Sequence, residues 1–301
     1  MTLTVSPEMS RRDEFDTWST LRGYLARQLV SGRLAVVLGA GVSSHFGLPT
    51  WEALITSLYS GRGGVPPDKP ATFQAEDFRN KYHSRDQDSF LADVKETLYK
   101  GIDISFSRMM SHHTFSGILS ILMASGPGTR TEVVSFNWDN LLEKYLALHG
   151  RVVASVFEEI HWAQSADVAI FHPHGYLPYG EITRSEKVIF DQLSYDEIMG
   201  SETIWRQVLL SLFRTRTCVL VGLSGEDQHL SALLYRVKKE HASFVNRTLF
   251  WAVAFTTSES SRGSWESRGV YPIVLTDYKE LPLKLFDITE AAVGIRSKQG
   301  V

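Results

Sequence analysis

The sequence predicts an α/β protein with a Rossmann-like, mostly parallel sheet, helices on both faces and a helical insertion. One observation is that apolar runs such as residues 34–38 (LAVVL) and 217–221 (TCVLV) are continuous, as in strands that are buried on both faces. Another is that stretches with helical periodicity separate several of these runs. A chain of 301 residues is long enough to bury the core of one such domain, which we expect to span residues 1–301.

The elements follow in chain order. Apolar residues at helical spacing from Phe15 to Leu29 predict a first helix that stops at Gly32, and residues 34–38 predict a strand. Thr50 is a candidate cap for a second helix, and the Gly- and Pro-rich residues 61–70 predict a loop. We interpret residues 61–130 as the helical insertion. Further strands are predicted over 132–136, 151–157, 168–173, 188–190, 217–222, 247–255 and 271–275, with helices over 140–150, 202–213 and 227–240.

Composition and charge narrow the function classes. With 31 Lys and Arg against 34 Asp and Glu, the chain carries a net charge of -3, whereas proteins that grip nucleic acid backbones are usually basic. The single cysteine, Cys218, excludes an intramolecular disulfide framework and a zinc site of several thiolates, so no structural zinc is expected. The N-terminus has no apolar signal region and no run reaches the ~20 residues of a membrane span, so we expect a cytoplasmic protein.

A glycine-rich turn follows the first strand. Gly39, Ala40 and Gly41 allow the backbone to approach a ligand, and amides at the start of the following helix could bind a pyrophosphate. The dinucleotide fingerprint G-x-G-x-x-G is not met, because Ser44 replaces the third glycine, and the acidic residue expected ~20 residues on is missing. There is also no P-loop motif. A tight turn without a ligand remains the alternative.

Polar residues follow two further strands. Asn137 and Asp139 come after residues 132–136, where open α/β sheets bind ligands, and we expect the Asn137 amide to face the crevice. The alternative is that Asp139 or Asn140 only caps the following helix. After residues 217–221 come Gly222 and Ser224, and Asp227 begins a helix that it could equally well cap.

Two histidines stand in the segment H-P-H-G. On a regular strand His172 and His174 would share one face and could bind a metal, but this requires further ligands and Pro173 disturbs the strand. We therefore interpret His174 as a general base at a strand end and His172 as a packing residue, and we expect no metal site.

Taken together, GAGVSSHFGLP, SFNWDN, HPHG and VGLSGED resemble, in that order, the sirtuin-like superfamily, and most closely its bacterial branch in antiphage defence proteins. The resemblance implies a Rossmann-like fold with an inserted module and NAD bound at the carboxyl ends of the strands. It implies catalytic roles for Asn137 and His174. The cofactor-binding residues that it implies, together with the turns above, are Gly39, Ala40, Gly41, Ser43, Pro49, Asp139, Gly222, Ser224 and Asp227.

The departures from the family pattern bear on the activity. Protein-deacylating sirtuins hold zinc with four cysteines, and Thr50-Trp51 stands here where they carry an arginine. The resemblance therefore implies hydrolysis of NAD to nicotinamide and ADP-ribose, which would deplete cellular NAD in abortive infection. Asn137 would place the water or the ribose hydroxyls, and His174 would accept a proton. The alternatives are a non-catalytic NAD or ADP-ribose sensor, a metal-dependent hydrolase that uses both histidines, and a deacylase.

An NAD hydrolase that is always active would kill its host, so we expect control. The chain ends soon after the last predicted strand, so we expect control by a homo-oligomer or a separate regulatory protein, by analogy a HerA-type hexameric ATPase, an Argonaute or another phage sensor. Aromatic residues in 71–130 and near Trp251 and Trp265 are candidates for such interfaces.

Overall fold

The structure is a computed structural model. It describes residues 10–11, 15, 17–67, 69–125, 131–158, 161–162, 164–180, 187–191, 194, 203–225, 228–242 and 249–299.

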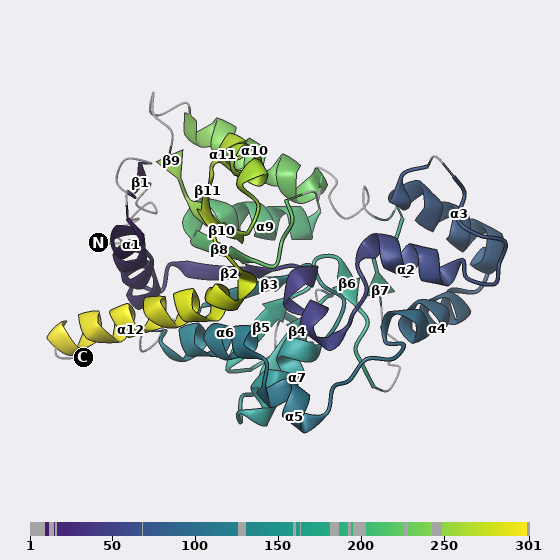
Figure 1. Ribbon diagram of the computed structural model, residues 1–301, viewed down its shortest axis with the longest axis horizontal. Coiled ribbons are helices and arrows are strands. Elements are labelled where there is room, and N and C mark those ends of the chain that lie inside the picture. The colour runs from purple at the N-terminus through teal and green to yellow at the C-terminus, as the bar shows by residue number, and fades with distance from the viewer. Residues whose placement is uncertain are drawn as a thin grey trace.

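The centre of the molecule is a seven-stranded sheet in which every pair of neighbouring strands is parallel (Figure 1). The strand order is β11-β10-β8-β2-β3-β5-β4. This confirms the predicted α/β, Rossmann-like class. The bounds are β2 (Leu34–Leu38), β3 (Glu132–Ser135), β4 (Val153–Val156), β5 (Val168–Phe171), β8 (Thr217–Val221), β10 (Ala252–Thr256) and β11 (Val270–Val274).

The strand order reverses between β2 and β8. The chain runs from β2 to β3 on one side and returns after β5 to β8, on the other side of β2. Ligands of open α/β sheets bind at the carboxyl ends of the strands beside such a reversal. The turns that follow β2, β3 and β8 therefore lie at the favoured edge.

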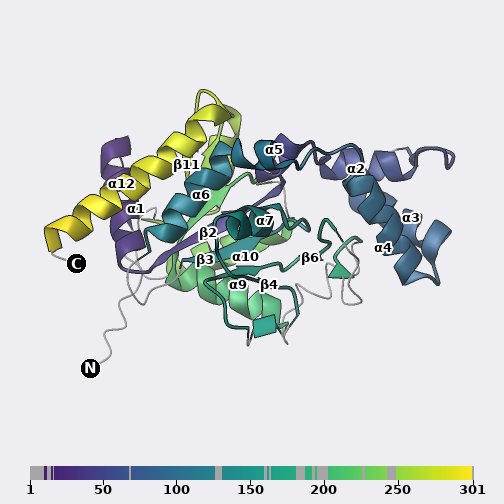
Figure 2. The same ribbon diagram turned by 90° about the horizontal axis from the view of Figure 1, so that it is seen from below.

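Helices cover both faces of the sheet because the strands are apolar on both sides. In β2, Val36 packs in the cluster of the first face and Val37 in that of the second. Figure 2 shows the sheet between the two helical layers. The first layer contains α1 (Trp18–Val30), α5 (Phe106–Met110), α6 (His113–Met123), α7 (Leu141–Leu148) and α12 (Leu281–Gln299). The second contains α9 (Ile204–Thr215), α10 (Gln228–Ala242) and α11 (Arg262–Ser267).

A third apolar cluster forms a small module beside the sheet, on the right in Figure 1. Its helices are α2 (Trp51–Leu58), α3 (Ala71–His83) and α4 (Gln87–Leu98). The hairpin of β6 (Gly175–Tyr176) and β7 (Lys187–Val188), with its flanks, adds Leu177, Val188 and Phe190 to this cluster. Within residues 61–130, α3 and α4 thus belong to the module, whereas α5 and α6 pack against the sheet.

The predicted and observed elements differ in the C-terminal part of the chain. Residues 247–255, expected as one strand, contain β9 (Leu249–Phe250) and the start of β10, and β9 pairs instead with β1 (Ser10–Arg11) in a separate antiparallel ribbon. The helix α12 was not predicted.

The aromatic residues proposed for interfaces are mostly core. Trp251 and Trp265 are each 1% exposed, so the expectation that they serve an interface is wrong. In the stretch 71–130, Phe73 and Phe106 are exposed, whereas Phe78 and other aromatic side chains are buried.

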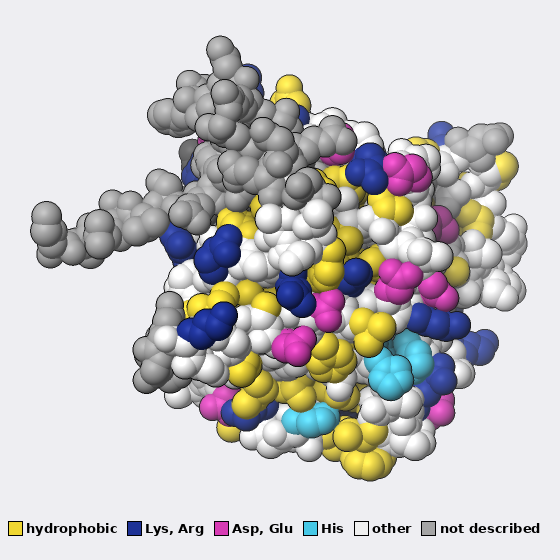
Figure 3. All heavy atoms as spheres, turned by 60° about the vertical axis from the view of Figure 1, so that its left-hand side comes forward, with side chains coloured by type: hydrophobic (Ala, Val, Ile, Leu, Met, Phe, Trp, Pro, Cys, Tyr) yellow, Lys and Arg dark blue, Asp and Glu magenta, His cyan; other side chains and the backbone are white. Residues whose placement is uncertain are grey.

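The surface carries both signs of charge. On the face drawn in Figure 3, Lys and Arg side chains alternate with Asp and Glu, and hydrophobic side chains lie among them. Within the described part of the chain, none of the helices is long and apolar enough to span a membrane.

Candidate functional site

The turn after β2 packs backbone to backbone against the turn after β8. Gly39 N donates to Val221 O (3.0 Å), and Gly41 N donates to Gly222 O (2.9 Å). A Cβ on Gly39 would lie 2.6 Å from Gly222 O, and one on Gly222 would lie 2.6 Å from Val42 N. Because no side chain fits between them, glycine is required here by the contact of the two turns.

The segment after this turn differs from the expected helix start. Two 3₁₀ turns, Ala40–Val42 and Ser44–Phe46, follow β2, and the next α-helix begins only at Trp51, in the small module. The helix start that directly follows the glycine turn is therefore a short 3₁₀ helix and not an α-helix. Ala40 and Gly41 are exposed, so a ligand can approach this turn, although Gly41 N already donates to Gly222 O.

Two capping residues hold the ends of this segment. His112 Nε2 donates to Val42 O (2.8 Å), while its Nδ1 accepts from Phe115 N (3.1 Å) at the start of α6. Burial lowers the pKa of His112 to about 4, so the ring is neutral at pH 7. Half-exposed Pro49 precedes Thr50, which caps α2 as predicted.

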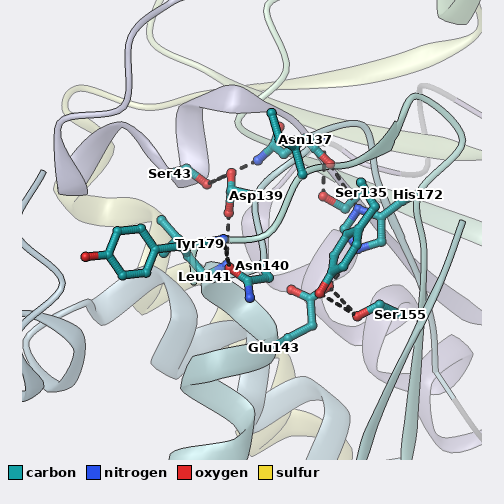
Figure 4. A network of polar contacts seen from close by, with 12 residues as sticks. Ser43, Ser135, Asn137, Asp139, Asn140, Leu141, Glu143, Ser155, His172 and Tyr179 are labelled. Atoms are coloured by element: carbon teal, nitrogen blue, oxygen red, sulfur yellow. Dashed lines mark hydrogen bonds and ion pairs between the residues drawn. The ribbon is translucent and has the colours of Figure 1, made fainter. Parts of the chain in front are cut away.

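Asn137, Ser43 and Asp139 form a hydrogen-bonded chain between the turns after β2 and β3 (Figure 4). Asn137 Nδ2 donates to Gly39 O (3.1 Å) and Ser43 Oγ (3.2 Å), and Ser43 Oγ donates to Asp139 Oδ2 (2.8 Å). Asp139 Oδ1 accepts from Leu141 N (3.0 Å), so this carboxylate also holds the start of α7. The two turns are thus fixed to each other by side chains.

The Asp139 carboxylate is buried, and its hydrogen-bond donors among the described residues, Ser43 Oγ and Leu141 N, are both neutral. Burial raises its pKa to about 6, and the hydrogen bonds from Ser43 and Leu141 offset only part of this effect. The Asp139 proton therefore titrates just below neutral pH.

His172 lies on the other side of the same loop and is fully buried. Its Nδ1 lies 2.9 Å from Asn137 O and its Nε2 lies 2.6 Å from Glu143 Oε1. Burial lowers the pKa of His172, but the charge and hydrogen bond of Glu143 outweigh this and raise it. Because β5 ends at Phe171, strand alternation does not extend to His172, which is a hydrogen-bonded residue and not the packing residue predicted.

His174 lies between the loop and the small hairpin. It is 8% exposed, and its ring centroid lies 4.7 Å from that of Phe136, which directly precedes Asn137. Its carbonyl accepts from Ile189 N (2.8 Å). Within the described ranges, no group of three His, Cys, Asp or Glu side chains is arranged to hold a metal ion.

The turn after β8 adds an exposed serine, Ser224. Gly222 adopts φ 70°, which favours glycine, and Ser224, two residues on, is exposed. The predicted residue Asp227 lies outside the described residues.

Two residues of the site, Glu143 and Trp138, were not predicted from the sequence. Glu143 pairs with His172 from 29 positions away, and no local pattern relates the two. Trp138, between Asn137 and Asp139, packs against the module, with its ring centroid 5.7 Å from that of Trp51, and its carbonyl accepts from Leu177 N (2.8 Å). An aromatic residue in a polar loop was the available signal for Trp138.

The fold and these joined turns define an α/β protein with a Rossmann-like sheet and a polar site at the strand reversal. Residues 131–273 match the family model of the SIR2-like domain, which supports a sirtuin-like domain. The matched range includes Asn137, Asp139 and both histidines, and the glycine turn after β2 precedes it. The chain is also 22% identical over 261 residues to the uncharacterized protein y4cA of Sinorhizobium fredii; this covers 83% of the chain and spans about a fifth (21%) of that relative's length.

Proposed function

We propose that the protein hydrolyses NAD to nicotinamide and ADP-ribose. The observation that carries the proposal is the chain from Asn137 through Ser43 to Asp139, which joins the turns after β2 and β3 at the strand reversal. The ring of His174 packs against Phe136, the residue before Asn137. The match to the SIR2-like domain supports NAD as the dinucleotide.

The residues present suit a dinucleotide substrate. Ala40 and Ser224 are exposed at the ends of two neighbouring strands, so a phosphate can approach the polar groups of these turns, whereas the Gly41 amide already donates to Gly222 O. Gly39 O can only accept, so the Asn137 side chain must direct its NH₂ group there and present Oδ1 as its remaining acceptor. Oδ1 can therefore accept a hydrogen bond from a ribose hydroxyl or a water.

The proposed step needs no general acid. The bond between the ribose anomeric carbon and the nicotinamide nitrogen breaks, and nicotinamide leaves neutral because it carries a positive charge in NAD. A water oxygen bonds to the anomeric carbon, and the water's proton passes to the His174 imidazole and then to solvent. ADP-ribose, nicotinamide and one proton are the products. Asn137 orients the water or the ribose while the oxocarbenium-like centre forms.

A non-catalytic sensor of NAD or ADP-ribose is the second candidate. It is favoured by the fact that the Asn137 NH₂ group and the Ser43 hydroxyl proton are both consumed within the protein. A site braced in this way could bind a nucleotide without turning it over. Calorimetric titration with ADP-ribose, compared with product formation from NAD, separates the two candidates.

The first test is product analysis with two site variants. Purified protein, alone and with the product of a neighbouring gene, is incubated with NAD, and the products are identified by mass spectrometry. Asn137→Ala and His174→Ala should each lower the rate by about 100-fold to 10,000-fold, because each removes a group at the reacting centre.

Melting temperatures of both variants are measured beside the rates, since a loss that follows unfolding says nothing about chemistry. If the wild-type protein cleaves NAD and neither variant slows it, the residue roles are wrong. If NAD stays intact in every combination while ADP-ribose binds, the sensor replaces the hydrolase.

We further propose that hydrolysis serves antiphage defence, as a homo-oligomer controlled by a regulatory protein such as a hexameric ATPase. The support is the resemblance of the four motifs to the defence branch. Cells expressing the wild type should lose NAD and restrict phage on infection, whereas cells expressing His174→Ala should do neither. Unchanged phage growth with the wild type would contradict the defence role and leave the hydrolase proposal standing.

A further inference from the structure

We propose that His172 and Glu143 act as a positioning pair, which holds the main-chain carbonyl of Asn137 and thereby the side chain that serves the reacting centre. His172 comes from the end of β5 and Glu143 from the first turn of α7, and both are buried. The expected effect on NAD cleavage rests on the proposed function. The expected effect on the order of the Asn137 loop rests on the contacts alone.

The chemistry of the acceptors fixes how this pair is protonated. Asn137 O can only accept, so His172 Nδ1 must carry a proton and donate it across 2.9 Å. Nε2 and Glu143 Oε1 then share one further proton across 2.6 Å, as imidazolium with carboxylate or as neutral imidazole with carboxylic acid. In both forms Nδ1–H stays directed at Asn137 O.

Glu143 is itself held in place. Ser155 Oγ donates to Glu143 Oε1 (3.3 Å) and also lies 3.0 Å from the Tyr176 hydroxyl. The His172 imidazole therefore cannot rotate without losing its hydrogen bond to Asn137 O or its hydrogen bond to Glu143 Oε1.

The carbonyl that His172 holds belongs to Asn137, whose side chain also connects the turns after β2 and β3. On one side of Asn137, His172 holds the main chain, and on the other side Gly39 O and Ser43 Oγ hold the amide. With both ends fixed, the direction of Oδ1 is determined, which is the kind of preorganisation that positioning requires.

Amide variants of His172 distinguish a role in positioning Asn137 from a role in packing alone. In His172→Asn the amide nitrogen replaces Nδ1 and can still donate to Asn137 O, whereas in His172→Gln it replaces Nε2 and cannot. Glu143→Gln can donate to Nε2 of a neutral imidazole, so Nδ1–H remains directed at Asn137 O. We expect His172→Asn and Glu143→Gln to keep the loop ordered and His172→Gln to loosen it.

Two readouts on the full chain test this. Hydrogen exchange of the peptide over residues 132–142 should be about tenfold faster in His172→Gln than in His172→Asn. In a protein that cleaves NAD, kcat should fall about 10-fold to 100-fold more in His172→Gln, with KM nearly unchanged because the phosphates bind elsewhere.

Tyr24→Phe is the matched control. It removes a buried hydrogen bond to Thr217 Oγ1 (3.0 Å) at the amino end of β8, remote from the loop, so it should lower the melting temperature without speeding exchange over 132–142. Equal effects of His172→Asn and His172→Gln, in exchange and in kcat, would overturn the proposal. If the wild type does not cleave NAD, the hydrolase proposal fails, and the exchange measurement still decides the positioning role.

Discussion

Asp139 shows how one residue can serve both the fold and the site. Its carboxylate accepts from the Ser43 hydroxyl and from the amide of Leu141, so it links the turn after β2 to the start of α7. Both partners are neutral, and burial raises its pKa to about 6 from an ordinary value of 3.8. A carboxylate with a raised pKa favours folding when protonated, so its contribution is present below pH 3.8 and is lost as pH rises through 6.

Asp139→Asn should remove this pH dependence. The difference in unfolding free energy, variant minus wild type, should rise between about pH 4 and pH 7 by on the order of 1 to 3 kcal/mol, because the wild type loses stability over that range. Urea denaturation at several pH values measures it. A difference that stays flat or falls with pH would contradict a raised Asp139 pKa.

At the residue scale, the sequence predicts where a residue lies relative to the end of a strand, but it does not predict which distant residue is its hydrogen-bond partner. Asn137 and Asp139 were predicted near the ligand edge because polar residues directly after a buried strand lie there. Glu143 was not, because it meets His172 only through the packing of α7 against the strands. The role of His172 was misjudged because alternation holds only within a strand, and β5 ends one residue earlier.

At the scale of elements, the contact of the turns after β2 and β8 places the strictest demand on the sequence. Gly222 adopts φ 70° and lies against the backbone of the facing turn. Gly61 adopts a similar φ of 75° but has open space where a Cβ would lie. The two positions share backbone strain and differ only in packing.

Gly222→Ala should therefore destabilise the protein more than Gly61→Ala. We expect about 1 kcal/mol for the left-handed backbone at either position and a further 1–3 kcal/mol, roughly, for the clash at Gly222. Chemical denaturation of the two variants side by side gives both values. If both variants lost the same unfolding free energy, the turns after β2 and β8 could move apart without cost, which would contradict the importance of their contact.

Most elements of the sheet were predictable because each parallel strand is a continuous apolar run. The helix α12 was missed because apolar residues occur on its buried side, as at Leu285 and Ile288, and also on its exposed side, as at Leu283 and Phe286. Its periodicity is blurred for that reason. The break between β9 and β10 was invisible because Trp251, between them, is as apolar as the strands.

On the scale of the whole molecule, α12 presents an apolar stripe to solvent. Leu283, Phe286 and Val293 are all exposed, and their spacing of three and seven residues places them along one side of the helix. This stripe supports the proposed homo-oligomer better than the buried tryptophans do.

We expect light scattering to give a mass above 33.9 kDa for the wild type and near 33.9 kDa for Leu283→Glu. Leu283 is 63% exposed, so the substitution should leave the fold intact, as a circular dichroism spectrum would check. Phe106→Glu, at a side chain that is 67% exposed on α5, is the matched control and should not change the mass. A monomeric, fully active wild type would rule out the oligomer.

The small module is built from segments that are far apart in the sequence, so its core cannot be complete until the later segment has been synthesised. Its helices come from residues 51–98, but Leu177, Val188 and Phe190 complete its apolar cluster. The central strand β2 likewise gains its neighbour β8 only from residues 217–221. On the ribosome, where the N-terminal part emerges first, α2–α4 must wait with an unfinished core for nearly a hundred residues of synthesis. The nascent chain therefore exposes the apolar side chains of the module until residue 190 has left the exit tunnel, and one edge of β2 until residue 221 has done so.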